Sequence, residues 1–293
     1  MYFVSIFRIV YNSTMTFNEW LQSATRQLTQ AKIETARLDS IILIEHVTKQ
    51  DRALLLADPN RAIESNYVRR LNNLLKKRAQ HVPIAYLLGH KEFYGRGFKV
   101  STDVMVPRPE TEAMIDMFKQ LCAGSLSAGI LKENGYVWRA ADIGTGSGAI
   151  GITASLEVNN VIIDLIDVSD EALDIARTNV VSFSTANRII KNDLLKDLPV
   201  KYDILLCNLP YVPDQYAVNR AASFEPRLAL FGGHDGLDIY RRLFSQVATR
   251  QVIPLYILTE ALPFSHLALE VIARKAGMRL LKTDNFIQLF TPK

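Results

Sequence analysis

The pattern of hydrophobic positions changes along the chain and predicts two domains with a short connection between them. Across residues 21–79, apolar side chains recur every three or four positions, which is typical of helices that bury one face. Over residues 86–106 the pattern alternates and glycines interrupt it, as expected for a β-hairpin. We therefore expect a small helical bundle in residues 1–85 and a connecting hairpin in residues 86–106.

From residue 136 onward, apolar runs of strand length alternate with amphipathic helical segments. We expect strands at 137–143, 161–167, 187–191, 202–207, 252–259, 278–282 and 286–291, and helices at 148–157, 171–181, 237–249 and 265–277. A further helix is expected before this region, at 111–121. Residues 123–135, rich in Gly, Ser and Ala, are expected to form a loop. The alternation predicts an α/β fold with a doubly wound, mostly parallel sheet of the Rossmann-like kind in residues 107–293.

The start of the helical domain is marked by Thr16 and Glu19, whose spacing is that of a capping box. We expect Met15 to be the native start and residues 1–14 to be an extension. Residues 1–11 are apolar but too short to span a bilayer, and they lack the cleavage site of an export signal. We therefore expect a cytoplasmic protein that does not associate with membranes.

Composition agrees with two folded domains in a reducing compartment. The chain has 293 residues, of which 48% are apolar and 22% charged, enough for a sizeable core. Its two cysteines, Cys122 and Cys207, show neither a disulfide framework nor a metal-binding spacing, so we expect no metal. The net charge of +4 permits an anionic partner such as an RNA-containing assembly, and ordinary solvated lysines explain it equally well. The first domain also contains a basic cluster, which consists of Arg69, Arg70, Lys76, Lys77 and Arg78. These residues either form a solvated helix face or contact a partner.

A glycine-rich loop follows the first strand of the second domain and opens a helix. It consists of Gly144, Thr145, Gly146, Ser147 and Gly148. Glycines let the backbone approach a ligand closely, and Asp167 at the end of the next strand can accept hydrogen bonds from ribose hydroxyls. The Gly-x-Gly-x-Gly spacing differs from the dinucleotide fingerprint and favours S-adenosylmethionine over NAD as the cofactor. Asp193 and Leu194 would flank the adenine, and an ordinary loop acid explains Asp193 nearly as well.

In the stretch that begins at Asp203, an unbroken apolar run, residues 204–207, ends at Asn208, Leu209, Pro210 and Tyr211. Such a run predicts a strand covered on both faces, whose carboxyl end delivers Asn208 to the rim where ligands bind. The side-chain carbonyl of Asn208 and the backbone carbonyl of Leu209 could each accept one proton of a substrate NH2 group. The ring of Tyr211 could lie against a flat amide or base. The alternative is a strand followed by an ordinary proline turn.

In a doubly wound sheet, this strand would lie beside the strand that carries the glycine loop. The methyl donor would then meet residues 208–211, which we call the NH2 cradle, at one rim of the sheet. An amide nitrogen is a poor nucleophile because its lone pair is delocalised. The protein's task would therefore be positioning and desolvation rather than strong base catalysis.

With these features the sequence resembles the bacterial methyltransferases that modify the glutamine of the Gly-Gly-Gln motif in peptide chain release factors. The resemblance covers roughly residues 16–278 and rests on segments 36–39, 89–98, 107–112, 142–150, 208–211, 225–233 and 235–238. Segment 225–233, Glu-Pro-Arg-Leu-Ala-Leu-Phe-Gly-Gly, separates this family from adenine methyltransferases that act on nucleic acid. Segment 108–112 favours release factors over a ribosomal protein as the substrate.

The resemblance implies a class I methyltransferase fold and a cytoplasmic, release-factor-specific protein-(glutamine-N5) methyltransferase. It implies that S-adenosylmethionine is held by Gly144, Thr145, Gly146, Ser147, Gly148, Asp167, Leu194 and Asn208. The substrate glutamine would be held by Asn208, Leu209, Pro210 and Tyr211, with Asn208, Pro210 and Tyr211 as the catalytic residues. We expect the helical domain to help dock release factors, and we expect a monomer without direct nucleic-acid contact.

Three departures from the family pattern matter. Leu209 replaces the first proline of the family's Asn-Pro-Pro-Tyr cradle, which keeps the carbonyl but adds backbone freedom worth about 0.4–1 kcal/mol and weakens activity in principle. Leu194 stands where some members have an aromatic residue, and the tail from Ile253 lacks the usual glycine hairpin. Three alternatives stay open: glutamine methylation of a ribosomal protein, adenine methylation of nucleic acid, and a cofactor-binding module with impaired turnover.

Overall fold

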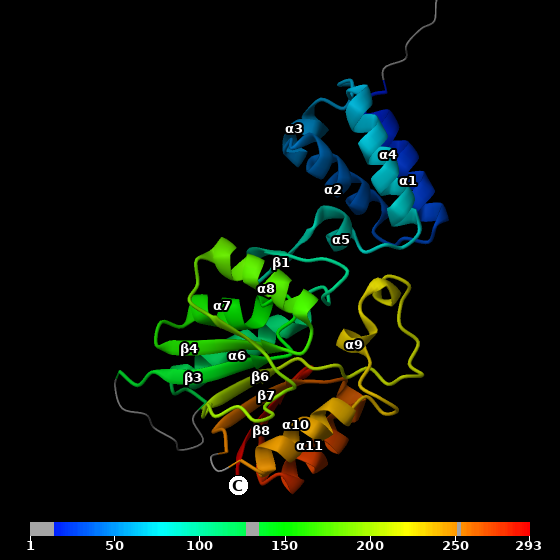
Figure 1. The fold of residues 1–293 in the computed structure, drawn as a ribbon. Coiled ribbons are helices and arrows are strands. Elements are labelled where there is room, and N and C mark those ends of the chain that lie inside the picture. The colour runs from blue at the N-terminus through cyan, green and yellow to red at the C-terminus, as the bar shows by residue number, and fades with distance from the viewer. Residues whose placement is uncertain (1–14, 127–134, 251–252) are drawn as a thin grey trace, which may run out of the picture. The chain divides into compact units, whose positions relative to one another are not determined.

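The computed structural model describes residues 15–126, 135–250 and 253–293 of the chain. The chain divides into two compact units, Met1–Leu88 and Gly89–Lys293, which we call the N-terminal and C-terminal units (Figure 1). The expected extension at 1–14 and most of the expected loop at 123–135 lie outside the described residues. Within the described part of the chain, no helix is long and apolar enough to cross a membrane. The same residues contain no group of three or more His, Cys, Asp or Glu side chains suited to a metal ion.

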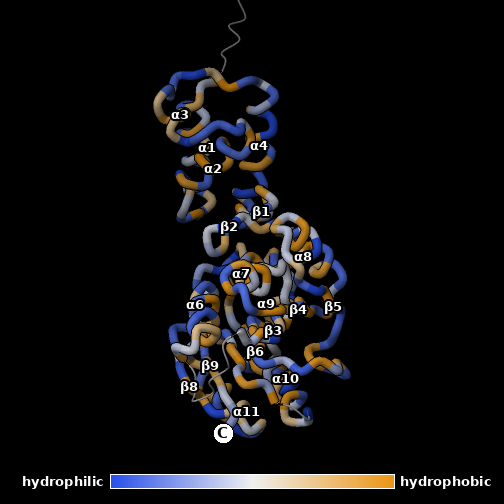
Figure 2. The backbone as a smooth tube through the Cα atoms, turned by 90° about the vertical axis from the view of Figure 1, so that its left-hand side faces the viewer, coloured by the Kyte–Doolittle hydropathy of each residue, from blue (hydrophilic) through white to orange (hydrophobic). Residues whose placement is uncertain are grey.

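The N-terminal unit is a bundle of helices around an apolar core. Its helices are α1 (Phe17–Gln30), α2 (Ala36–Thr48), α3 (Arg52–Ala57), α4 (Ser65–Ala79) and α5 (Ile84–Leu88). Along α1 and α4, hydrophobic and hydrophilic residues alternate (Figure 2), as expected for helices that bury one face. The buried sides of the helices meet at Trp20, Leu28, Leu43, Ile44 and Leu71. The helical nature predicted for this part of the chain is confirmed.

The first helix begins where the capping box predicts. The backbone N–H of Glu19 donates to Oγ1 of Thr16 at 3.3 Å, and the backbone N–H of Thr16 donates to Oε2 of Glu19 at 2.8 Å. This reciprocal pair satisfies two backbone donors that a helix start otherwise leaves without a partner.

Arg78 differs from the sequence prediction. It is 9% exposed, and its Nε donates to Oδ2 of Asp39 at 2.6 Å, whereas the basic cluster was expected on a solvated or partner-contacting face. The pairing joins residues 39 positions apart, which helical periodicity alone cannot reveal. The other four members of the cluster are exposed on α4: Arg69, Arg70, Lys76 and Lys77.

A seven-stranded sheet forms the centre of the C-terminal unit, in the order β5-β4-β3-β6-β7-β9-β8. Its strands are β3 (Trp138–Ile143), β4 (Val161–Asp167), β5 (Arg188–Lys191), β6 (Ile204–Cys207), β7 (Tyr256–Glu260), β8 (Met278–Asp284) and β9 (Ile287–Pro292). The strands from β5 to β7 pair in parallel, and β9 pairs antiparallel with both β7 and β8. The predicted doubly wound, mostly parallel α/β fold is confirmed.

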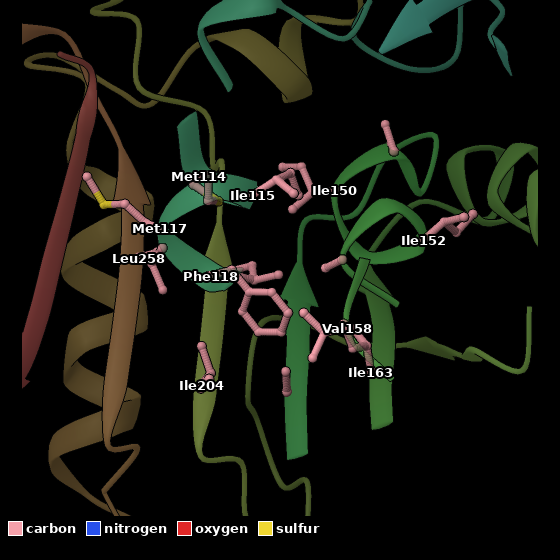
Figure 3. Packing of buried hydrophobic residues seen from close by; sticks show 14 of the residues in the cluster. Met114, Ile115, Met117, Phe118, Ile150, Ile152, Val158, Ile163, Ile204 and Leu258 are labelled. Carbon is pink, nitrogen blue, oxygen red and sulfur yellow. The ribbon is translucent and has the colours of Figure 1, made fainter. Parts of the chain in front are cut away.

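Helices cover both faces of this sheet. They are α6 (Glu112–Cys122), α7 (Ala149–Glu157), α8 (Asp170–Phe183), α10 (Asp238–Ala248) and α11 (His266–Lys275). The short α9 (Arg227–Leu230) lies in the segment between β6 and α10. On one face, Phe118 of α6 packs in a cluster with Ile204 of β6 (Figure 3). On the other face, Phe244 of α10 and Leu269 of α11 pack against the same strands. Because both faces are covered, β6 is apolar without alternation.

The C-terminal unit starts with the expected hairpin, whereas the residues just before it are helical. Strands β1 (His90–Phe93) and β2 (Arg96–Lys99) pair antiparallel around Tyr94 and Gly95, which have φ values of 51° and 70°. Positive φ at both positions is what a two-residue hairpin turn requires. Residues 86–88, read from sequence as part of the hairpin segment, instead complete α5, which at five residues is too short to show a helical period.

The final part of the sheet begins later than expected. The strand predicted at 252–259 starts at Tyr256, and residues 251–252 lie outside the described part of the chain. The short helix α9 was not predicted, because four residues carry no readable periodicity. The closing pair of strands was predicted and is present as β8 and β9.

Candidate active site

The carboxyl ends of β3 and β6 lie side by side. The two strands are parallel neighbours, and Ile143 pairs with Cys207 in their register. Gly144 and Asn208 are the next residues after these partners, so the glycine loop and Asn208 emerge together at one rim of the sheet. The neighbourhood expected from the sequence is confirmed.

A cavity of about 200 Å³ lies at this rim, within the C-terminal unit. Nine of the predicted site residues line it: Gly144, Thr145, Gly146, Ser147, Asp167, Leu194, Asn208, Leu209 and Pro210. They come from the ends of four neighbouring strands, β3, β4, β5 and β6. Of the remaining two, Gly148 is the N-cap of α7, and Tyr211 lines a neighbouring cavity of about 230 Å³ together with Arg108.

The glycine loop is tight where it meets Leu209. Gly144 has a φ of 70°, in the left-handed region that favours glycine. A Cβ atom at position 144 would lie 2.9 Å from Cδ2 of Leu209, so a larger residue requires a shift. Gly148, with a φ of 81°, is the N-cap of α7 and turns the chain from the loop into the helix. These two positions need glycine for the backbone to follow this path.

Asp142 is the buried acid beneath this loop. Its Oδ2 accepts hydrogen bonds from Oγ1 of Thr145 at 2.6 Å and from the backbone N–H of Gly151 at 2.9 Å. Its Oδ1 is buried and has no hydrogen-bond partner among the described residues. Burial raises the pKa of the Asp142 carboxyl to about 6, although both hydrogen bonds act in the opposite direction. Asp142 therefore ties the loop to the first turn of α7 from the inside.

Asp167, at the end of β4, holds the cavity side of the loop. Its Oδ2 accepts from the backbone N–H of Gly146 at 2.9 Å, and its Oδ1 accepts from the backbone N–H of Ser169 at 3.0 Å. The carboxylate is partly buried in the cavity lining. Because a carboxylate can accept about four hydrogen bonds, lone pairs remain for the hydroxyls of a ribose.

The segment after β5 adds an apolar contact and an ion pair. Leu194 is 8% exposed, has a φ of 56° and lines the cavity. The side chain of Asn192 donates to the backbone carbonyl of Leu194 at 3.0 Å. Asp193 pairs with Arg242 of α10, which sequence analysis did not single out, and both line the same cavity. Leu194 thus offers an apolar surface, with polar groups beside it, to a flat base.

Asn208 is held from the inside of the protein. Its Nδ2 donates to Oγ1 of Thr111 at 3.2 Å. The two ends of an asparagine amide have opposite hydrogen-bonding characters, so this contact leaves Oδ1 for a partner in the cavity. Thr111, 2% exposed, is a second residue that sequence analysis did not single out.

Leu209 is anchored through both its backbone and its side chain. The side chain is 2% exposed and belongs to the core on the side of α10 and α11. Its backbone N–H donates to the hydroxyl of Tyr240 at 3.3 Å. That hydroxyl also lies 2.9 Å and 2.6 Å from the backbone oxygens of Cys207 and Glu260. The added freedom of a leucine in place of proline therefore belongs to the unfolded chain, because the folded loop is pinned.

Tyr211 contacts Glu260, a buried acid that sequence analysis missed. The Tyr211 hydroxyl donates to Oε1 of Glu260 at 3.0 Å. Glu260 is the last residue of β7 and is 1% exposed. Burial raises the pKa of Tyr211 and of Glu260 above their ordinary values. The signal that could have found Glu260 is its place at the carboxyl end of the strand beside β6, where ligands of parallel sheets bind.

Two protein families match consecutive parts of the chain. Residues 19–89 match the PrmC N-terminal domain, and residues 123–224 match the methyltransferase small domain. The first match covers most of the N-terminal unit. The second covers the glycine loop, Asp167 and the segment with Asn208.

Curated relatives match over most of their length. The release factor glutamine methyltransferase of Koribacter versatilis is 33% identical over 238 residues, which is 80% of this chain and 81% of the relative. The proteins of the same name from Coxiella burnetii and Bacillus subtilis are 33% and 32% identical. These matches cover 84% and 79% of this chain, and 86% and 80% of the respective relatives.

Among solved structures, the hMettl16 catalytic domain in complex with MAT2A 3′UTR hairpin 1 has a similar fold. Its TM-score is 0.52 at 15% identity, with 79% of this chain and 82% of that chain covered. At this identity the likeness concerns the fold alone.

Proposed function

Because the chain belongs to the release factor glutamine methyltransferase family, we propose that it methylates the side-chain amide nitrogen of the glutamine in the Gly-Gly-Gln motif of release factors. The family resemblance seen in the sequence is confirmed by these relatives. The protein is a methyltransferase, and S-adenosylmethionine is its cofactor. One observation carries the proposal: the glycine loop and Asn208 emerge side by side on neighbouring parallel strands, at one cavity.

The residues around the cavity fit S-adenosylmethionine. We assign the ribose hydroxyls to Asp167, which keeps lone pairs after accepting its two backbone N–H groups. The backbone of Gly144 to Gly148 turns tightly enough to approach the donor, and Leu194 offers an apolar face for the adenine. The bound donor supplies a methyl group on a positively charged sulfur. The residues of the protein orient the acceptor nitrogen of the substrate.

In the proposed reaction, Asn208 orients the substrate amide. Its Oδ1 accepts one proton of the glutamine NH2 group, the carbonyl of Leu209 accepts the other, and the ring of Tyr211 lies against the amide plane. Pro210 keeps the segment between them stiff. The nitrogen lone pair then points toward the methyl group. Orientation of this kind contributes about 7–11 kcal/mol in favourable cases.

The N-terminal unit is proposed to dock the release factor. The residues lining the candidate cofactor cavity all belong to the C-terminal unit, which leaves the helical unit for another task. The exposed basic residues of α4 are one contact candidate. Changing Arg69 and Arg70 together to Glu should raise the KM for an intact release factor and leave donor affinity unchanged. An unchanged KM would remove this face from the docking surface.

We place the protein in the cytoplasm, as a monomer without direct nucleic-acid contact. The free cysteines Cys122 and Cys207 support a reducing compartment. Light scattering on the purified protein tests the monomer, because a mass of about twice 33.0 kDa would contradict it.

The experiment that tests the function is a transfer assay with labelled S-adenosylmethionine. Purified protein is incubated with intact release factors and, as a matched control, with release factors whose Gly-Gly-Gln glutamine is changed to alanine. Two further arms contain ribosomal protein and adenine-containing nucleic acid. Label on the first substrate alone supports the proposal. Label in either of the further arms, or in the alanine control, contradicts it, and donor binding without transfer to any substrate identifies a binding module.

A further inference from the structure

The side chain of Asn208 can face the cavity in two ways, and only one of them suits the proposed reaction. With Oδ1 outward it accepts a proton of the substrate NH2 group. With Nδ2 outward, its N–H donors would face the N–H donors of the substrate, and no hydrogen bond could form. The two ends of the amide have nearly the same shape, so packing cannot fix its orientation. The orientation is therefore fixed by a hydrogen-bond partner.

Thr111 contacts Asn208 but cannot make this choice alone. Its Oγ1 lies 3.2 Å from Nδ2 of Asn208. A hydroxyl carries one donor and two acceptor lone pairs, so it would also donate to Oδ1 if the amide were flipped. The orientation is fixed only when the single proton of Thr111 is committed elsewhere.

Glu260 is the group with a fixed preference. An ionised carboxylate only accepts hydrogen bonds, and this one is 1% exposed. Oε1 accepts from the Tyr211 hydroxyl, whereas Oε2 is buried without a hydrogen-bond partner among the described residues. Cys207 pairs with Thr259 in the register of β6 and β7, so Asn208 and Glu260 are the next residues on neighbouring strands. Burial raises the pKa of Glu260, and hydrogen bonding by the side chains of Thr111, Tyr211 and Asn208 acts in the opposite direction. A buried acceptor without a donor is costly, which favours turning these donors inward.

We propose that Glu260 is a positioning residue that draws the Thr111 hydroxyl and the NH2 end of Asn208 toward itself, and so turns Oδ1 of Asn208 toward the substrate. The inference rests on the proposed function, because it explains how the side-chain amide of Asn208 is oriented for the proposed reaction. Glu260 itself does not touch the reacting atoms. Its effect passes through Asn208.

The first test is Glu260→Gln, which keeps the shape but supplies a donor as well as an acceptor. We expect kcat to fall by at least about tenfold, because the amide is no longer held in one orientation, while the donor Kd changes by less than about twofold. Thermal stability should stay equal or rise, because a buried charged group has been removed. A merely structural role predicts the reverse, lower stability with kcat retained, and that result would overturn the proposal.

The second test uses the hydroxyl between the two residues. Thr111→Val removes it and should lower kcat, whereas Thr111→Ser should restore kcat to within about threefold of the native value. Combined with Glu260→Gln, Thr111→Val should add little, because both changes break one chain of contacts. Losses that multiply would show independent roles. Thr259→Val is the matched control: it removes a buried hydroxyl on β7 that faces the backbone of Gln288, and it should leave kcat unchanged.

A third measurement needs no substrate and separates this inference from the proposed function. In protein labelled with ¹⁵N at asparagine, the side-chain NH2 protons of Asn208 should exchange slowly with water. In Glu260→Gln they should exchange at least about tenfold faster. Equal exchange in both proteins would overturn the positioning role of Glu260. If the side-chain protons of Asn208 exchange faster in Glu260→Gln than in the native protein, but the native protein methylates no release factor, only the proposed function is overturned.

Discussion

Arg108 and Glu225 form an ion pair that joins two segments 117 residues apart. Nη2 of Arg108 donates to Oε1 of Glu225 at 2.5 Å, and the backbone N–H of Val106 donates to Oε2 at 3.2 Å. The Glu225 side chain is 1% exposed and that of Arg108 is 35% exposed. Burial raises the pKa of Glu225 even though Arg108 opposes the shift. The pair connects two of the sequence segments that carry the family resemblance, 107–112 and 225–233.

We expect Glu225→Ala to lower the free energy of unfolding by about 1–3 kcal/mol, because it leaves Arg108 and a backbone N–H without their acceptor. Urea denaturation measures this loss. Arg177→Ala is the matched control, because its ion pair with Asp174 is exposed on α8, and its effect should stay within about 0.5 kcal/mol. Equal losses in the two variants would show that the buried pair contributes no more than a surface pair.

Asp167→Ala should weaken S-adenosylmethionine binding by about 1–3 kcal/mol, because ribose hydroxyls lose a charged acceptor. The loop also loses the hydrogen bond from Gly146 to Asp167. Titration calorimetry on the folded variant measures the change. Asp170→Ala provides the control, since that side chain is 61% exposed and neither it nor its partner Lys191 lines the cavity. Native affinity in folded Asp167→Ala would remove this residue from the cofactor site.

Asp142 should make stability depend on pH. Its pKa rises from 3.8 to about 6 on folding, so the folded state holds the proton more tightly than the unfolded chain. The stability contributed by this group is therefore fully present below pH 3.8 and is lost as the pH rises through 6. A shift of this size corresponds to at most about 3 kcal/mol.

The measurement compares native protein with Asp142→Asn by urea denaturation between about pH 4 and pH 7. Asparagine does not titrate, so the native protein should lose stability relative to the variant across this interval. Carboxyls elsewhere titrate in both proteins and cancel in the comparison. A difference that is independent of pH would mean that the Asp142 carboxyl does not change its pKa on folding.

The strands and the main helices were predictable because their signals are local. The apolar run ending at Cys207 reads as a covered strand, and the glycines after Ile143 read as a loop that opens a helix. Strand pairing then follows from the rules for parallel sheets, which place Gly144 beside Asn208.

The contacts around Asn208 were not predictable because they join distant positions. Thr111 lies 97 residues from Asn208, and Glu260 lies 49 residues from Tyr211. The place of Glu260 at the carboxyl end of Tyr256–Glu260 makes it a candidate, but the run itself does not reveal the contact with Tyr211. Arg78 shows the same limit, since a helical pattern assigns it to a charged face and only the packed bundle reveals Asp39.

Asn208→Ala should lower turnover by at least about a hundredfold, because the substrate amide loses a preorganised acceptor. Donor affinity should be retained. Steady-state methylation of an intact release factor, together with calorimetry for the donor, separates the two effects. If most of the activity survives, the substrate nitrogen is oriented by other groups, and the inference about Glu260 loses its premise.

The final prediction concerns Leu209→Pro, which restores the cradle of the family. Turnover should stay equal or rise, because the carbonyl of position 209 is present with either residue and proline stiffens the loop. Stability should fall by about 1–3 kcal/mol, because the buried leucine side chain packed against Gly144 and the N–H bonded to Tyr240 are both lost. Turnover is measured on a release factor, and stability by thermal unfolding.

The two readouts distinguish the ways in which Leu209 acts. If Leu209→Pro is less stable but turns over at the native rate, the leucine side chain contributes to the core and only the backbone carbonyl of position 209 contributes to the reaction. A fall in turnover of more than about tenfold, with donor affinity intact, means that the side chain or N–H of Leu209 shapes the cradle in this protein. If the native protein is inert on every release factor while Leu209→Pro is active, the chain binds the donor without turnover, and the proline is the missing element of the active site.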